Sequence, residues 1–290
     1  MQLDSLVLAT DGSADAAHAR RAVIDIARGT GMPVHVVSAW NLHATAYGSA
    51  YVLNDVLAGQ YASEARALVE AECAELIGGG VTAVTAHVEC GRPSDVILSL
   101  ADRVNCGLVV VGCRGQGPLA RLALGSVSDS VVREAGLPVL VVRHGDTAWP
   151  PERVVVGYDG SPEAVVASRL GATLAECVDA PLTVLEVVPV LSEGELAVQG
   201  VDRLEIVDDR RADLEKRLDV MLDPPPRGVA VEVEIGHPAA LLIAAAEGPP
   251  PALLAVGRRG IGLMRHMLLG SVSTKVLHGA PGAVLVTPYR

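Results

Sequence analysis

Phenylalanine is absent from the 290 residues of this chain, and aromatic residues make up only 2% of it. Because half of the residues are hydrophobic, the core must be aliphatic, and the many short valine- and leucine-rich runs predict strands that are buried on both faces. No apolar run reaches the roughly 18 residues that span a bilayer. The first residues carry Asp4 and Asp11 and lack the pattern of a secretory leader. We therefore expect a cytoplasmic protein with no membrane partner.

Lysine is scarce as well, and cysteines spaced as C-x-x-C pairs are absent. Lys216 and Lys275 are the only lysines, and the formal net charge is −11. This charge argues against broad binding to nucleic acid, although it leaves room for a local pocket for a small anion. The five cysteines form no C-x-x-C pair, so we expect free thiols. Cys113 could be a redox sensor or simply a small residue in a loop.

The chain repeats itself. The segment Leu6–Ala17 matches Val154–Val165 at an offset of 148 residues, and later segments match at an offset of 145. Such self-similarity indicates a tandem duplication. We therefore predict two domains, residues 1–145 and 151–290, joined by a polar segment that contains two prolines.

Strand-like and helix-like patterns alternate within each copy. In the first copy we expect strands at 6–9, 33–39, 81–88, 107–111 and 138–142, and helices at 14–29, 63–77, 93–104 and from about 126. Alternation of this kind predicts right-handed β-α-β units and a parallel sheet covered on both faces. In the second expected helix, one stripe should be buried: Ala65, Leu68, Val69, Cys73 and Leu76. In the second copy, "EGPPPALLAV" should shorten the third helix.

A glycine frame of the form G-x-x-G-x9-G-S occurs twice, at Gly112–Ser126 and Gly257–Ser271. Each follows an apolar strand, and ligands of open parallel sheets bind beyond the carboxyl ends of the strands. Gly115 and Gly117 would let the backbone bend and approach a ligand. The helix that starts at Ser126 would offer backbone N–H groups and a positive dipole end to a phosphate. A glycine-rich surface turn is the alternative, which the recurrence of the spacing disfavours.

An aspartate ends the first strand of each copy, within "TDGS" and "YDGS". Asp11 and Asp159 would lie on the same sheet edge as the glycine frames, where a carboxylate could accept a hydrogen bond from a base or a ribose hydroxyl. The alternative is that each aspartate caps the following helix, as Ser13 and Ser161 could also do. Both roles can hold at once.

The D-G-S after the first strand, the glycine frame and the closing "PVLVV" resemble the universal stress protein family in its tandem form. The resemblance covers essentially the whole chain. It implies two Rossmann-like (adenine nucleotide α-hydrolase-like) domains of the α/β class, each with a five-stranded parallel sheet in the order 3-2-1-4-5. It also implies dimerisation and, because the glycine frame is present, binding of ATP, with which Mg²⁺ could be associated.

The resemblance also implies a set of binding residues. The aspartates and the chain near Ala39 or Val187 would hold the adenosine, and the glycine frames would hold ribose and phosphates. The full set is Thr10, Asp11, Ala39, Gly112, Arg114, Gly115, Gly117, Gly125, Ser126 and Ser128 in copy one, and Asp159, Val187, Gly257, Arg259, Gly260, Gly262, Gly270, Ser271 and Ser273 in copy two. Copy two has Tyr158 in place of Thr10, which could crowd the base, so copy one is expected to be the better site.

Catalytic motifs are missing. There is no Walker pattern G-x-x-x-x-G-K-[ST], and neither glycine frame contains an acidic residue to act as a base or metal ligand. No residues have metal-ligand spacing, so we expect no metal site and no catalytic residue. The function we predict is an ATP-binding regulator of stress response or growth, a homodimer of two-domain chains with an unidentified regulatory partner. A slow ATPase, and a binder of another nucleotide such as cyclic AMP, remain alternatives.

Overall fold

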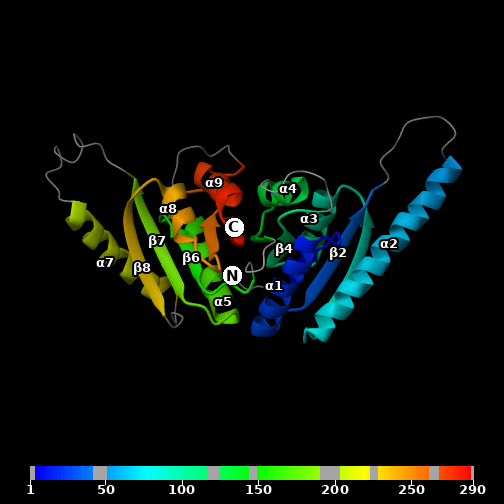
Figure 1. The fold of residues 1–290 in the computed structure, drawn as a ribbon, viewed down its shortest axis with the longest axis horizontal. Coiled ribbons are helices and arrows are strands. Elements are labelled where there is room, and N and C mark those ends of the chain that lie inside the picture. The colour runs from blue at the N-terminus through cyan, green and yellow to red at the C-terminus, as the bar shows by residue number, and fades with distance from the viewer. Residues whose placement is uncertain are drawn as a thin grey trace. The chain divides into compact units, whose positions relative to one another are not determined.

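The computed structural model describes residues 4–41, 51–115, 124–143, 149–189, 203–222, 228–260 and 268–288. Contacts within the chain divide it into two compact units, Met1–His144 (unit 1) and Gly145–Arg290 (unit 2). In both units strands alternate with helices along the chain (Figure 1). The predicted α/β fold class is therefore confirmed.

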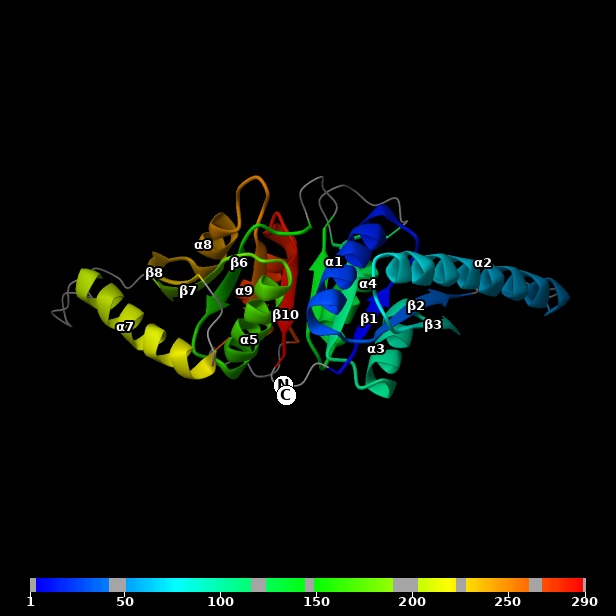
Figure 2. The same cartoon turned by 90° about the horizontal axis from the view of Figure 1, so that it is seen from below.

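Unit 1 is a five-stranded parallel sheet with helices on both faces. Its elements are β1 (Leu6–Ala9), α1 (Ala14–Thr30), β2 (Val34–Trp40), α2 (Tyr51–Gly78), β3 (Val84–Cys90), α3 (Pro93–Arg103), β4 (Leu108–Gly112), α4 (Ser126–Glu134) and β5 (Val139–Val142). The strands lie in the order β3-β2-β1-β4-β5, all parallel. Helices α1 and α2 contact each other, as do α3 and α4, and the two pairs cover opposite faces of the sheet (Figure 2).

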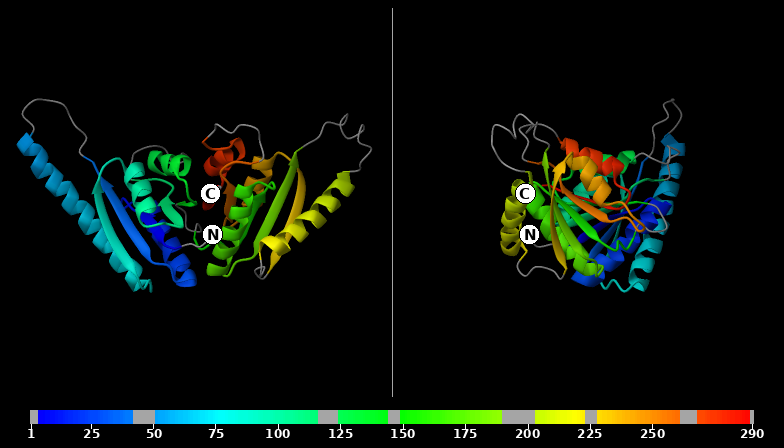
Figure 3. Two further views of the ribbon diagram at one scale, coloured as in Figure 1. Left: turned by 180° about the vertical axis from the view of Figure 1, so that it is seen from behind. Right: turned by 60° about the vertical axis from the view of Figure 1, so that its left-hand side comes forward.

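Unit 2 repeats this plan. Its elements are β6 (Val154–Tyr158), α5 (Pro162–Cys177), β7 (Leu182–Pro189), α7 (Arg203–Met221), β8 (Val229–Gly236), α8 (Pro238–Ala245), β9 (Leu253–Gly257), α9 (Ser271–Gly279) and β10 (Val284–Thr287). The parallel strands lie in the order β8-β7-β6-β9-β10. Helix α8 is shorter than α3, as predicted. Figure 3 shows the yellow α7 running beside the outer strands of its unit, as the blue α2 does in unit 1.

The sequence of unit 1 explains where its first helix begins and ends. Strand β1 is apolar and almost wholly buried, which suits a central strand of a sheet covered on both faces. Helix α1 begins after Ser13, whose side chain accepts a hydrogen bond from the backbone N–H of Ala16. It ends at Gly31, which adopts a left-handed conformation (φ 73°) and donates to the carbonyl of Ala27. The predicted helix end is confirmed.

The face of α2 that packs on the sheet contains a carboxylate. Of the predicted stripe, Ala65, Val69 and Leu76 are buried, whereas Leu68 and Cys73 are only half-buried. Glu72 is buried as well, at 4% exposed. One oxygen of Glu72 accepts a hydrogen bond from the Thr10 hydroxyl at 3.3 Å, and the other lies 3.0 Å from the Arg20 guanidinium. The predicted stripe was incomplete because it counted only apolar residues, whereas a buried charge is tolerated where it is paired.

We expect Glu72→Ala to lower the free energy of unfolding by about 2–3 kcal/mol, because it leaves a hydroxyl and a guanidinium without their buried acceptor. Glu75→Ala is the matched control, since Glu75 contacts the same Arg20 at 3.6 Å while its side chain is 65% exposed. It should cost less than about 1 kcal/mol. Urea unfolding followed by circular dichroism measures both. Equal losses for the two variants would contradict a buried role for Glu72.

Two histidines meet on neighbouring strands of unit 1. Nδ1 of His35 on β2 lies 3.0 Å from Nε2 of His87 on β3, and the ring centroids are 5.2 Å apart. Burial lowers the pKa of both side chains. His87 lowers the pKa of His35 further, whereas for His87 the raising effect of Glu89 exceeds the lowering effect of Arg103 but does not overcome burial. The folded protein therefore favours the neutral pair.

These lowered pKa values set the direction of a pH effect. Below the ordinary histidine value of about 6.5 the unfolded chain binds protons that the folded pair resists, so stability should fall as the pH drops from about 7 to about 5. In His87→Gln this acid-side loss should be smaller. Urea unfolding at several pH values measures it. A variant whose stability depends on pH as steeply as that of the wild type would show that the pair does not titrate in this way.

Candidate functional site

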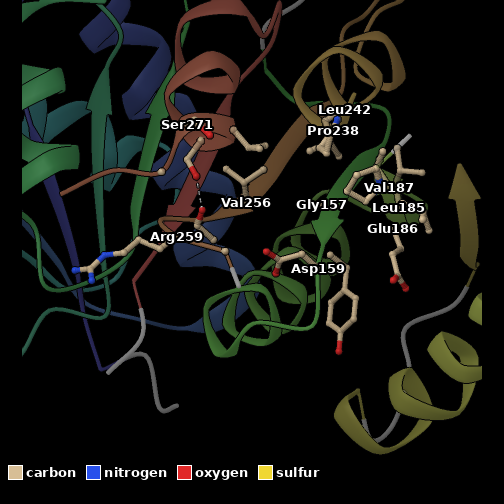
Figure 4. A pocket seen from close by; sticks show the side chains of 18 of the residues that line it. Gly157, Asp159, Leu185, Glu186, Val187, Pro238, Leu242, Val256, Arg259 and Ser271 are labelled. Atoms are coloured by element: carbon tan, nitrogen blue, oxygen red, sulfur yellow. Dashed lines mark hydrogen bonds between the residues drawn. The ribbon is translucent and has the colours of Figure 1, made fainter. Parts of the chain in front are cut away.

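A cavity of about 730 Å³ opens beyond the carboxyl ends of β6, β7 and β9 in unit 2. Its walls include every predicted copy-two residue within the described part of the chain: Asp159, Val187, Gly257, Arg259, Gly260, Gly270, Ser271 and Ser273. Gly262, like Gly117 of copy one, lies outside the described residues. Figure 4 shows Asp159 at the end of β6, with Leu185, Glu186 and Val187 of β7 on one side of it and Ser271 on the other. Residues more than 100 positions apart thus meet around one space.

The first glycine of each frame is required by helix packing. A Cβ on Gly257 would lie 2.7 Å from Cβ of Glu163 and 3.0 Å from the carbonyl oxygen of Arg259. In unit 1 a Cβ on Gly112 would lie 2.7 Å from the backbone carbon of Asp15. The first turn of the helix after the first strand therefore passes directly over this glycine. Gly112 and Gly257 therefore have a packing role, and their predicted binding role stays a prediction.

The second glycine of each frame makes room for the aspartate that ends the first strand. In unit 2 a Cβ on Gly260 would overlap Oδ2 of Asp159, and in unit 1 Gly115 has the same relation to Asp11. The other oxygen of Asp159 accepts a hydrogen bond from the backbone N–H of Ser161 at 3.0 Å. The aspartate therefore shapes the turn before the helix and also lies beside the glycine frame.

Serine side chains cap α1 and α5, the helices that follow the first strand of each unit, as the capping alternative predicted. Ser161 accepts from the backbone N–H of Ala164 at 3.2 Å, as Ser13 does from Ala16 in unit 1. Ser13 also donates to the carbonyl of Arg114 at 3.2 Å and so ties the cap to the glycine frame. Capping thus falls to the serine, and the aspartate holds the turn.

The hydroxyl groups of Ser128 and Ser273, which were expected to donate to a phosphate, donate to backbone carbonyls of the glycine frames. Ser273 donates to the carbonyl of Gly257 at 2.7 Å, and Ser128 donates to the carbonyl of Cys113 at 2.8 Å. Both serines are buried. Their hydroxyls thus close the frame, and their predicted role toward a phosphate stays a prediction. Ser271 is exposed at the start of α9, where the first-turn N–H groups have no acceptor within the helix.

Arg114 of the first glycine frame contacts a carboxylate at the start of α1. The backbone N–H of Arg114 donates to Oδ2 of Asp15 at 2.9 Å, and Nε of Arg114 lies 3.6 Å from the same oxygen. Figure 4 shows the side chain of Arg259 directed away from Asp159 and Glu186. Cys113 is fully buried, and burial raises the pKa of its thiol. This disfavours the redox-sensor alternative, because the reactive form is the thiolate.

Unit 1 has a smaller cavity, of about 450 Å³, beside Asp11 and Ala39. Its walls come from Trp40 and from α2 residues such as Tyr61. A Cβ on Gly157 in unit 2 would lie 2.9 Å from Cδ1 of Leu242, and unit 1 has an alanine, Ala9, at the matching position. The cavity of about 450 Å³ in unit 1 is not lined by the described residues of its glycine frame, so which copy is the better site stays a prediction.

Tyr158, which the sequence suggested could crowd the base, is buried and forms part of the cavity wall. Sequence reasoning missed two other residues of this wall. Glu186 and Arg210 also line the cavity, with 3.0 Å between the Arg210 guanidinium and the carboxylate. Burial raises the pKa of Glu186, and Arg210 opposes that rise. A charge within the apolar run "LTVLEVVP" was the available signal, but the contact with α7 is visible only in the fold.

The described residues include neither a cluster of metal ligands nor a membrane-spanning helix. Among them, no group of three or more histidine, cysteine, aspartate or glutamate side chains is placed to hold a metal ion. In the same parts of the chain, no helix combines the length and apolar character needed to cross a bilayer.

Comparisons with known proteins agree on one family. The sequence model of the universal stress protein family matches residues 3–143 and 151–288. A universal stress protein of Mycobacterium tuberculosis is 34% identical over 186 residues, which is 62% of this chain and 61% of that protein. One from Mycolicibacterium smegmatis is 33% identical over 234 residues, 80% of this chain and 77% of that protein. The fold matches the crystal structure of a universal stress protein from Archaeoglobus fulgidus with a TM-score of 0.75 at 22% identity, over 100% of both chains.

The two glycines of the copy-two frame should respond differently to the same change. Gly257→Ala should lower the free energy of unfolding by about 1–3 kcal/mol, because the new methyl group meets backbone atoms. Gly260→Ala meets only the end of the Asp159 side chain, which can rotate, so its cost should stay below about 1 kcal/mol. Urea unfolding compares the two. The packing role of Gly257 is wrong if the two costs are equal.

Proposed function

This chain belongs to the universal stress protein family, and on that basis we propose that unit 2 binds ATP and that the protein acts as a nucleotide-responsive regulator. The observation that carries the proposal is the single cavity that gathers the predicted copy-two residues. Its volume of about 730 Å³ lies within the range of small-molecule sites. We propose further that unit 1 also binds ATP and that Mg²⁺ accompanies the nucleotide. The chain would form a homodimer and act on a regulatory protein partner.

The walls of the cavity suit the parts of a nucleotide. The N-terminus of α9 at Ser271 offers backbone N–H groups and a positive dipole end, which favour a phosphate. Val187, Leu242 and Val256 supply apolar walls against which a base can pack. Asp159, beside Gly260, would accept from a ribose hydroxyl or from the base. The chain thus provides an anion seat, an apolar slot and an acceptor within one space.

The same walls support binding and regulation over turnover. No lysine is among the described residues that line the cavity. Its acidic residues are Asp159, one oxygen of which is held by the Ser161 N–H, and Glu186, which is paired with Arg210. Phosphoryl transfer requires a positioned base and metal ligands, and neither carboxylate is arranged as such. A slow ATPase would nevertheless reveal itself by phosphate release from the purified protein.

The direct experiment is to purify the full chain, denature it and identify the released small molecules by chromatography. We expect adenine nucleotide at up to two molecules per chain. Isothermal titration with ATP after removal of bound nucleotide gives the affinity. Failure to bind ATP in that titration would overturn the proposed function.

Asp159→Ala should weaken ATP about 5- to 30-fold while weakening inorganic triphosphate much less, because the lost hydrogen bond is to the nucleoside and not to the phosphates. Asp11→Ala is the matched variant for unit 1. Titration of both ligands into each variant measures the effect. Equal losses for ATP and triphosphate would mean that the aspartate only holds the turn to Ser161.

A further inference from the structure

Arg217 of α7 contacts the wall of the unit 2 cavity from outside. It is not one of the residues that line the cavity, and its side chain is 54% exposed. Its guanidinium donates a hydrogen bond to the hydroxyl of Tyr158 and lies 2.8 Å from a carboxylate oxygen of Asp213, one turn earlier on the helix. Tyr158, in contrast, is 6% exposed and forms part of the cavity wall. Arg217 therefore acts on the cavity through the tyrosine.

The residues that Arg217 approaches flank Asp159 on both sides along the chain. Tyr158 precedes the aspartate, and Gly160 follows it in a left-handed conformation (φ 81°). A Cβ on Gly160 would lie 3.8 Å from Nη1 of Arg217, so the guanidinium lies close to both neighbours of the aspartate. One oxygen of Asp159 accepts a hydrogen bond from the backbone N–H of Ser161. The turn that carries the carboxylate is therefore held from the side of α7 as well as by its own backbone.

Unit 1 has the same arrangement, built from different residues. Thr10 precedes Asp11, and its hydroxyl donates to Glu72 of α2 at 3.3 Å while it accepts from the backbone N–H of Gly12 at 3.3 Å. Thr10 and Glu72 are both buried. In each unit, a side chain of the helix after the second strand thus holds the residue that precedes the aspartate. The contact recurs although its chemistry differs, a hydroxyl with a carboxylate in one unit and a phenol with a guanidinium in the other.

The inference rests on the proposed function, in which Asp159 accepts a hydrogen bond from the nucleoside. Such a bond contributes most when the carboxylate already has the productive position, because binding otherwise has to order it. We propose that Arg217 is a positioning residue of the unit 2 site, which holds Tyr158 and Gly160 and thereby keeps the Asp159 carboxylate in place for the nucleoside. Its effect on a nucleotide is indirect and concerns the nucleoside, not the phosphates.

The test compares the affinities of ATP and inorganic triphosphate for the full chain by isothermal titration, in an Asp11→Ala parent whose unit 1 is weakened. Arg217→Ala should weaken ATP about 3- to 10-fold, the worth of one hydrogen bond, and should change the affinity for triphosphate less than about twofold. Tyr158→Phe removes only the hydroxyl that Arg217 contacts and should weaken ATP to the same extent. The double variant should be no weaker than either single variant, because both changes remove the same contact.

Lys216→Ala is the matched control. Lys216 is the neighbouring residue on α7, is exposed and does not line the cavity, so its loss removes the same charge without removing the contact with Tyr158. It should leave both affinities within about twofold of the parent. A second control places Arg217→Ala in a chain that also carries Asp159→Ala, where it should have no further effect on ATP. Circular dichroism checks that each variant is folded.

Four results would overturn the positioning role of Arg217. Arg217→Ala leaves the affinity for ATP unchanged, weakens ATP no more than Lys216→Ala does, weakens triphosphate as much as ATP, or still weakens ATP when the carboxylate of Asp159 is gone. In each of these cases the parent still binds ATP, and the proposed function stands. If the parent binds no ATP, the proposed function and the inference fail together.

Discussion

Each unit depends on the absence of a side chain at the end of its fourth strand. Gly112 and Gly257 lie so close to the first turn of the helix that follows the first strand, α1 or α5, that a Cβ would come within 2.7 Å of its atoms. This contact fixes the height of the helix over the sheet and therefore the position of the aspartate that precedes it. The aspartate in turn lies against the second glycine of the frame. Helix packing, the turn at the aspartate and the candidate anion site therefore all depend on the close contact between this glycine and the helix.

The two repeats keep this frame and differ in what surrounds it. In unit 1 the polar contact beneath the site is Thr10 with Glu72 and Arg20. In unit 2 it is Glu186 with Arg210, and Gly157 replaces an alanine at the floor of the cavity. Changes of this kind leave the sheet intact because they lie at the carboxyl ends of the strands. They change the volume and charge of the space in which a ligand would bind.

A strongly acidic chain can still hold an anion if the favourable groups are backbone amides. The net charge is −11, and the backbone N–H of Arg114 in the first frame is bound to Asp15. The start of α9 supplies N–H groups whose number and direction do not depend on side chains. The glycines themselves recur because a Cβ at the first two positions of each frame would meet the helix or the aspartate after the first strand.

The sequence alone determined the fold class, the repeat, the ends of α1 and the family, because these depend on local periodicity, capping residues and glycine spacing. The tertiary structure decided which residues line the cavity of unit 2, since Asp159, Val187 and Gly257 come from three different strand ends. It also showed that the hydroxyls of Ser128 and Ser273 close the loop. Glu72 and Glu186 escaped the sequence analysis because a buried carboxylate is recognised by its partners, and Arg20 and Arg210 lie 52 and 24 residues away along the chain. Contacts at such separations are set by the packing of helices on the sheet, which no local pattern encodes.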